Sequence, residues 1–136
     1  MAAEKPIPKL RGEEQVYFEE AKNGRLVFQR CRDCSQHIFY PRTVCTACMS
    51  EDLEYVASSG KGSVYSFTTL HLPGHPAFAD DVPYTIVLVD LEEGVRVLAD
   101  LVDCEPDDAA VGMPVEVLFD AVTEDFTLPR FRPVGN

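Results

Sequence analysis

Hydrophobic and polar residues alternate along much of the chain after Gly60, in the two-residue period of half-buried β-strands. Val115, Val117 and Phe119 are one clear example of this alternation. The alternating segments are rich in β-branched and aromatic residues, and clusters of Gly, Pro and acidic residues separate them. The pattern predicts five strands, at residues 63–71, 84–91, 95–102, 114–122 and 127–134.

The connections between these strands favour a small closed barrel. Residues 91–94 join the second and third strands so tightly that these two are expected to form a hairpin. A short helical turn is expected near residues 107–111, before the fourth strand. Five short strands in this arrangement are typical of an OB-fold barrel, and a small β-sandwich is the alternative.

A different period precedes the barrel. Within residues 12–24, the apolar side chains of Tyr17, Phe18 and Ala21 fall on neighbouring turns of a helix. Acidic residues stand near its start, where the helix dipole favours them, and Gly24 can form a left-handed cap at its end. We therefore expect a short helix, whose apolar stripe serves core packing at least as well as partner docking.

Four cysteines lie between this helix and the barrel, as two C-x2-C pairs: Cys31 with Cys34, and Cys45 with Cys48. A strand at residues 26–29 leads into the first pair. Each pair can aim two sulfurs at one point, and two pairs make the tetrahedral S4 set that suits Zn²⁺. Four thiolates leave no open coordination position, so the zinc would be structural. Iron in the same geometry is the alternative.

Other residues near the cysteines have simpler interpretations. Cys104 stands alone and is expected to be a small buried apolar residue. His37 is expected at the surface, because four cysteines already complete a metal shell. Arg30, Arg32 and Arg42 flank the cysteines and either offset the negative charge of the site or are solvated.

The charge distribution disfavours one class of partner. The chain has a net charge of −11, which divides into +2 for residues 1–50 and −13 for residues 51–136. Nucleic acids are usually bound by clusters of Lys and Arg, and the acidic second part would repel them. No nucleic-acid partner is therefore expected.

The 136 residues are expected to divide into a helical segment at 1–25, a zinc ribbon at 26–58 and an OB-fold domain at 59–136. No apolar run approaches the roughly 20 residues of a membrane span, so no membrane partner is expected. The N-terminus lacks the apolar core of a secretory signal, which indicates a cytoplasmic location.

The sequence contains no self-contained catalytic motif. It has no phosphate-binding glycine loop, no G-x-S-x-G elbow and no H-E-x-x-H pair. Its acidic doublets, such as Glu92-Glu93, fall in predicted turns and are expected to be solvated. His71 and His75 bracket a loop that continues to Phe78. One of them could act as a base, but both are more simply interpreted as polar loop residues. The expected role is binding, or completing the site of another protein.

The order of these blocks resembles the zinc-ribbon/OB-fold family associated with acyl-CoA enzymes, formerly classed as a domain of unknown function. CRDCSQHIFYPRTVCTACMSEDLEYV, GKGSVYSFTTLH and LPRFRPV are among the blocks that carry the resemblance. It extends roughly from Gln15 to the C-terminus, and it implies a mainly β protein with an N-terminal helix, a rubredoxin-like zinc ribbon and a C-terminal five-stranded OB-fold barrel. Ser35 and Met49 depart from the family, which often has Gly after each second cysteine.

The resemblance implies a non-catalytic accessory subunit. By this resemblance the chain is expected to be a partner of a thiolase-superfamily enzyme. Such an enzyme would be a thiolase or retro-aldolase in the degradation of steroid side chains or aromatic compounds. The partner carries the catalytic groups, and the accessory subunit helps to form the acyl-CoA site. Candidate contacts with the partner or with CoA are Phe39, Tyr40, Pro41, Arg42, His75, Phe78, Arg130 and Arg132. The arginines are chosen because a guanidinium binds phosphate.

Two other functions remain open at this point. One is a zinc-ribbon/OB protein that binds single-stranded nucleic acid, which the charge disfavours. The other is a stand-alone acyl-CoA hydrolase or lyase that would use His71 or His75.

Overall fold

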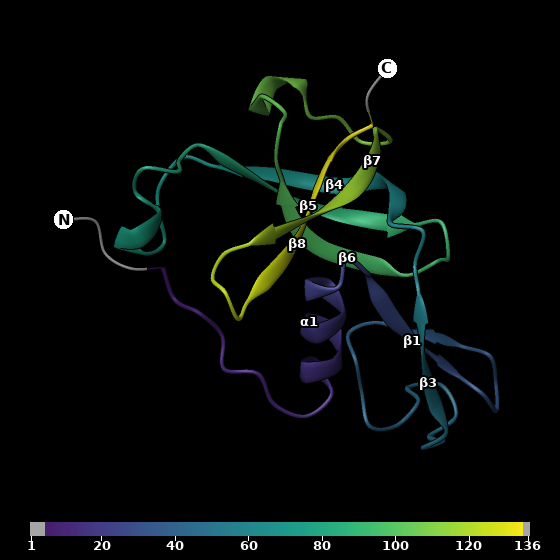
Figure 1. Cartoon of the computed structure of the whole chain (residues 1–136). Helices are drawn as coiled ribbons and strands as arrows, with labels where there is room; N and C mark the ends of the chain where they lie inside the picture. The colour runs from purple at the N-terminus through teal and green to yellow at the C-terminus, as the bar shows by residue number, and fades with distance from the viewer. Residues whose placement is uncertain (1–4, 135–136) are drawn as a thin grey trace.

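The structure is a computed structural model that describes residues 5–134, and it confirms the mainly β architecture. Within these residues one α-helix, α1 (Glu14–Lys22), precedes a three-stranded ribbon and a five-stranded closed barrel. In Figure 1 the ribbon lies below the barrel, and α1 lies beside it against the barrel. The ribbon consists of β1 (Val27–Cys31), β2 (His37–Ile38) and β3 (Leu53–Ala57), in the order β2-β1-β3.

The barrel contains the five strands that the hydrophobic pattern predicts, with boundaries shifted by at most two residues. They are β4 (Lys61–Leu70), β5 (Tyr84–Leu91), β6 (Arg96–Leu101), β7 (Pro114–Ala121) and β8 (Thr127–Pro133). Their order is β4-β5-β6-β8-β7, and β7 pairs with β4 to close the barrel. β5 and β6 form the expected antiparallel hairpin. Two short 3-10 helices, η1 (Pro76–Phe78) and η2 (Pro106–Asp108), interrupt the connections.

The barrel interior is the main core of the protein. Along β5, Thr85, Val87, Val89 and Leu91 are buried, and the residues between them are only half-buried. The strand therefore has an inner and an outer face, as its alternating sequence predicts. Aromatic and β-branched side chains from the other strands complete the interior, including Val64, Val97, Val115 and Phe131.

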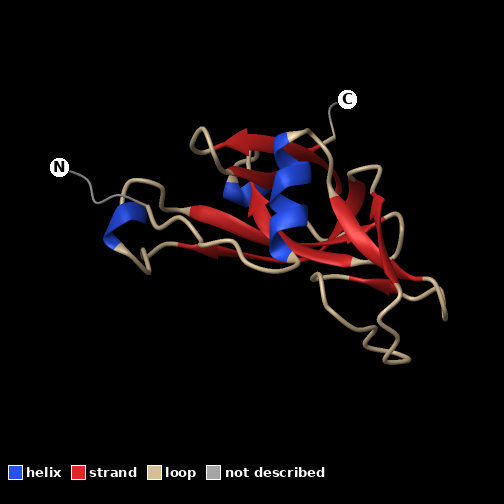
Figure 2. Ribbon diagram, turned by 60° about the horizontal axis from the view of Figure 1, so that its bottom comes forward, coloured by secondary structure: helices blue, strands red, loops and turns tan. Residues whose placement is uncertain are grey.

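Helix α1 lies against the barrel (Figure 2), and its apolar side chains pack there. Ala21 is buried, and Tyr17 packs against the barrel core. The ring of Phe18 lies 5.0 Å from the ring of Phe126, the residue before β8. Gly24 has a φ of +78°, so it takes the left-handed conformation expected just after the helix end. Among the described residues, no helix has the length and apolar character needed to span a membrane.

A cluster of hydrogen bonds joins the ribbon to the β5–β6 hairpin, and it corrects two expectations. His37 is half-buried rather than a surface residue: its ring packs edge-on against Phe28, and its Nδ1 lies 2.9 Å from the carbonyl oxygen of Glu93. Glu93 is not a freely solvated turn residue. Its carboxylate accepts hydrogen bonds from the Ser58 hydroxyl at 2.8 Å and from the Ser59 N–H at 2.7 Å.

These bonds determine the acidity of Glu93. Burial raises the pKa of its carboxyl, but the donors on Ser59 and Ser58 lower it more, so the pKa lies below its ordinary value. A lowered pKa in the folded state means that the carboxylate stabilises the fold above its unfolded pKa. That contribution is lost as the pH falls through the folded pKa.

Replacing Glu93→Gln is expected to lower the free energy of unfolding at pH 7 by about 1 kcal/mol, because charged hydrogen bonds at a half-exposed site are lost. The difference in unfolding free energy between the variant and the unaltered chain should become smaller as the pH is lowered toward 4, because the Glu93 carboxylate becomes protonated. Chemical denaturation at a series of pH values measures it. Glu92→Gln is the matched control, because Glu92 is exposed and accepts only from the Ser59 hydroxyl among the described residues. Equal losses of unfolding free energy in the two variants would contradict the stabilising role given to the Glu93 carboxylate.

Candidate metal centre and docking surface

The two cysteine pairs meet at one end of the ribbon. All four Sγ atoms lie within 4.8 Å of one another. The Sγ of Cys31 is 3.6 Å from that of Cys48, and the Sγ of Cys34 is 3.6 Å from that of Cys45. A tetrahedral zinc site with Zn–S bonds of about 2.3 Å has sulfur–sulfur separations of about 3.8 Å. The donor set therefore fits Zn²⁺, as the C-x2-C spacing predicts.

The two knuckles have matching backbone geometry. The N–H of Ser35 donates to the carbonyl of Cys31 at 2.9 Å, and the N–H of Met49 donates to that of Cys45 at 3.0 Å. Ser35 and Met49 both have a φ of +66°, in the left-handed region where glycine is preferred. These are the two positions where the sequence departs from the family's frequent glycine, and both still take the left-handed turn.

The thiols of the centre differ in acidity: the pKa is lowered at Cys45 but raised at Cys34 and Cys48, where the backbone N–H donors lower it less than burial and the neighbouring thiols raise it. Burial raises the pKa of the Cys45 thiol, but the N–H groups of Cys48 and Ala47 and the thiol of Cys34 lower it more, so the pKa lies at about 7. When bound, zinc would cross-link the two loops. All four positions would be filled by sulfur, so the centre is structural rather than a Lewis-acid site.

Two of the arginines beside the centre are paired with carboxylates. Arg30 contacts Glu54 at 3.2 Å, and Arg32 contacts Glu54 at 3.3 Å and Asp52 at 3.1 Å. These pairs tie the first knuckle to the start of the β3 region. Arg42 makes no ion pair within residues 5–134 and is exposed, so its guanidinium is accessible to a ligand.

The loop that carries Tyr40, Pro41 and Arg42 is held by a residue that sequence reasoning missed. Gln29, on β1, is buried, and its side-chain amide bonds both backbone groups of Arg42. Its Nε2 donates to the Arg42 carbonyl at 2.9 Å, and its Oε1 accepts from the Arg42 N–H at 2.7 Å. The available signal in the sequence is an amide residue directly after a run of three apolar residues, Leu26–Phe28, which are buried.

A groove with a volume of about 560 Å³ lies between this loop, α1 and the outer face of the barrel. We call it the ribbon groove. Tyr40, from the loop, and Leu98, from β6, both line it and are 48% and 53% exposed. Phe39 does not line it: its ring packs 5.5 Å from Tyr17, against the core. The structure thus gathers Tyr40, Pro41 and Arg42 into one exposed surface and gives Phe39 a supporting position.

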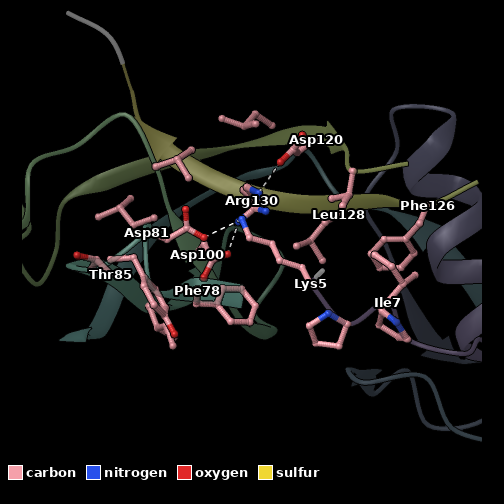
Figure 3. A pocket seen from close by; sticks show the side chains of 18 of the residues that line it. Lys5, Ile7, Phe78, Asp81, Thr85, Asp100, Asp120, Phe126, Leu128 and Arg130 are labelled. Atoms are coloured by element: carbon pink, nitrogen blue, oxygen red, sulfur yellow. Dashed lines mark hydrogen bonds and ion pairs between the residues drawn. The ribbon is translucent and has the colours of Figure 1, made fainter. Parts of the chain in front are cut away.

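The other candidate contacts lie elsewhere on the barrel. The His75 ring caps η1, because its Nδ1 accepts from the Ala77 N–H at 3.0 Å. Phe78 and Arg130 line a second cavity of about 670 Å³, the outer cavity, shown in Figure 3. Other lining residues come from the N-terminal segment and from β5 to β8, among them Ile7, Ile86, Leu118, Phe126 and Leu128.

Arg130 and Arg132 are occupied by carboxylates. Arg130 is paired with Asp100 on β6, and its Nε lies 2.9 Å from Asp120 on β7. Arg132 contacts Glu116 at 3.2 Å. Carboxylates already neutralise both of these guanidinium groups, so Arg42 is the best placed of the three predicted arginines to bind a phosphate.

The environment of the remaining cysteine favours the protonated, less reactive form of its thiol. Cys104 is half-buried. Burial raises the pKa of its thiol, and the carboxylates of Asp108 and Glu105 raise it further. A raised pKa disfavours the thiolate, which is the nucleophilic form.

Two family models match the chain. Residues 18–54 match the rubredoxin-like zinc ribbon domain of ChsH2, and residues 55–120 match the C-terminal OB-fold domain of ChsH2. The chain is also similar to a solved structure described as an Ltp2-ChsH2(DUF35) aldolase. The TM-score is 0.85 at 40% sequence identity, and the match covers 93% of this chain and 98% of that one.

Curated relatives show the same domains in different contexts. The chain is 37% identical to a DUF35 domain-containing scaffold protein of Methanocaldococcus jannaschii, over 82% of this chain and 83% of that protein. It is 40% identical to a probable enoyl-CoA hydratase alpha subunit of Thermomonospora curvata, over 95% of this chain. The chain spans only 40% of the length of that hydratase subunit. It is 38% identical to the benzoylsuccinyl-CoA thiolase subunit BbsA of Geobacter metallireducens, over 62% of this chain and 57% of that subunit.

Replacing Cys45→Ser is expected to abolish stoichiometric zinc binding, because one buried ligand of four is lost. Elemental analysis of the purified protein should give about one zinc per unaltered chain and a large loss in the variant. Cys104→Ser, outside the centre, is the matched control and should keep the metal. Full zinc retention by Cys45→Ser would show that the four sulfurs do not form the site.

Proposed function

The chain belongs to the DUF35 family of ChsH2-type zinc-ribbon and OB-fold proteins, and we propose that it is a non-catalytic accessory subunit of a thiolase-superfamily acyl-CoA enzyme. In this role it docks to the enzyme and helps to form the acyl-CoA site. The partner supplies the groups that make and break bonds.

The ribbon groove is the observation that carries the proposal. It presents an exposed aromatic residue, Tyr40, and an exposed aliphatic residue, Leu98, on two rigid parts of the fold. The Gln29 amide holds the loop in place, so little conformational entropy remains to be lost when a partner binds. Aromatic and arginine side chains at the centre of a groove are typical of residues that dominate binding energy.

The arrangement of reactive groups supports a role without catalysis. Four of the five cysteines form the metal centre, and Cys104 is held as a thiol. His75 uses a ring nitrogen to cap η1. The names of relatives that are subunits of a thiolase and of an aldolase assembly favour the same role.

The candidate contacts have different parts in the proposal. Tyr40, Pro41 and Arg42 would touch the enzyme or the CoA phosphates directly, and Phe39 would support them from the core. His75 and Phe78 would form a separate contact around η1. Arg130 and Arg132 would contribute less to phosphate binding, because carboxylates already neutralise their charge.

The acyl substrate is proposed by class. Relatives act in steroid and aromatic metabolism by name, so we propose an acyl-CoA from the degradation of steroid side chains or aromatic compounds. CoA thioesters of this kind are metabolites of the cytoplasm, where we propose that the complex acts. We expect no nucleic-acid partner, because residues 51–136 carry a net charge of −13.

The proposal is tested by coexpressing the chain with a thiolase-like enzyme from the same gene cluster and measuring the affinity of the purified pair. Tyr40→Ala is expected to weaken the complex at least about tenfold, because large aromatic residues often dominate the binding energy of an interface. Tyr65→Ala is the matched control, because Tyr65 is 49% exposed on β4, away from the ribbon groove. The chain alone should not turn over acyl-CoA.

Two results would contradict the proposal. One is rapid acyl-CoA hydrolysis or cleavage by the isolated chain, lost on replacing His71 or His75. The other is a stable complex whose affinity depends on Tyr65 and not on Tyr40. Zinc content and circular dichroism establish that each variant is folded before its affinity is measured.

A further inference from the structure

The outer cavity lies on the outside of the barrel, and a segment of the chain forms one of its walls. Residues 5–8 extend past the barrel strands there (Figure 3). Lys5 anchors the segment through an ion pair with Asp81 at 2.7 Å. Its ammonium nitrogen also lies 5.5 Å from the centre of the Phe78 ring. The cavity volume of about 670 Å³ is within the range of small-molecule sites.

Most of the lining is apolar. Ile7 comes from the N-terminal wall, Ile86 from β5 and Leu118 from β7. Phe126, just before β8, and Leu128, on β8, continue this surface. Such a surface favours the hydrocarbon part of a ligand, because burying it removes apolar area from water.

The charged residues of the cavity disfavour an anion. Its two cations, Lys5 and Arg130, are each paired with carboxylates of the same cavity. The four lining aspartates are Asp81, Asp100, Asp103 and Asp120, so the carboxylates outnumber the cations. A phosphate or a free carboxylate would therefore meet a net negative wall.

Arg130 nevertheless retains hydrogen-bonding capacity. A guanidinium has five N–H donors in a fixed plane. The structure uses Nε for Asp120 and Nη1 for Asp100, and Arg130 is largely buried at the cavity wall. Its other N–H groups can donate to an oxygen in the cavity, while the two carboxylates neutralise its charge.

We propose that the outer cavity binds an uncharged, mainly hydrocarbon molecule that carries an oxygen acceptor, such as a ketone or an ester. The oxygen accepts from Arg130, and the hydrocarbon part lies on the apolar surface formed by Leu118, Phe126 and Leu128. The N-terminal segment covers the bound molecule. This inference goes beyond the accessory role, since it concerns the chain without a partner.

The chain has no tryptophan, so one introduced at the cavity is a unique fluorescent reporter. Val122→Trp places it at the cavity wall, and Val111→Trp places it at an exposed turn outside the cavity. The probes are 2-undecanone, undecanoate of the same chain length, and CoA. We expect the ketone to change the emission of Val122→Trp but not that of Val111→Trp, and to bind at least tenfold more tightly than undecanoate or CoA.

Arg130→Lys tests the oxygen contact, because lysine keeps the charge but not the planar set of donors. It is expected to weaken ketone binding at least fivefold, and Arg132→Lys, on the same strand but outside the cavity, should leave it unchanged. Titration calorimetry on the chain without introduced tryptophan repeats the comparison if Val122→Trp does not fold. Absence of ketone binding, or equal binding of undecanoate or CoA, would overturn the proposal. Failure to find an enzyme partner would leave this result unaffected.

Discussion

The ribbon depends on its sulfur centre. Its own core contains only Cys31, Ile38 and Cys45, with Leu53 packed against them. A cluster of this size buries too little apolar surface to fix two long loops by itself. Bonds from four sulfurs to one metal ion supply the missing constraint, because they join loops that are separated by ten residues of chain. The positions of the ribbon loops therefore depend on the metal centre.

The loop that carries Tyr40, Pro41 and Arg42, which we call the docking loop, lies between the two halves of the metal centre. Tyr40, Pro41 and Arg42 stand between the two cysteine pairs in the sequence, and Gln29 ties the loop to β1 two residues before Cys31. The rest of the ribbon groove is lined by α1 and the barrel, whose core includes Phe28 of β1 but is a separate cluster from the one around the cysteines. The hydrogen bonds of Glu93 fix the two parts relative to each other. Metal binding therefore helps to fix the position of the docking loop, and the position of this loop determines the shape of the ribbon groove.

The sequence predicts the local features well and the long-range contacts poorly. The bounds of β5 and the hairpin with β6 follow from alternation and a tight turn, which are properties of adjacent residues. The metal ligands follow from spacing. β2 and β3 were not predicted as strands, because β2 is too short for a periodic signal and β3 is half-buried along most of its length. The roles of His37 and Arg130 depend on residues distant in sequence, so no local pattern reveals them.

The most direct test of the account is the affinity of the enzyme partner for the chain with and without zinc, measured by surface plasmon resonance. Chelation should release the docking loop while the barrel stays folded, as circular dichroism can establish. The account predicts that the zinc-free chain binds at least tenfold more weakly and that restoring zinc restores the affinity. Equal affinity of the two forms, with the barrel intact in both, would contradict it.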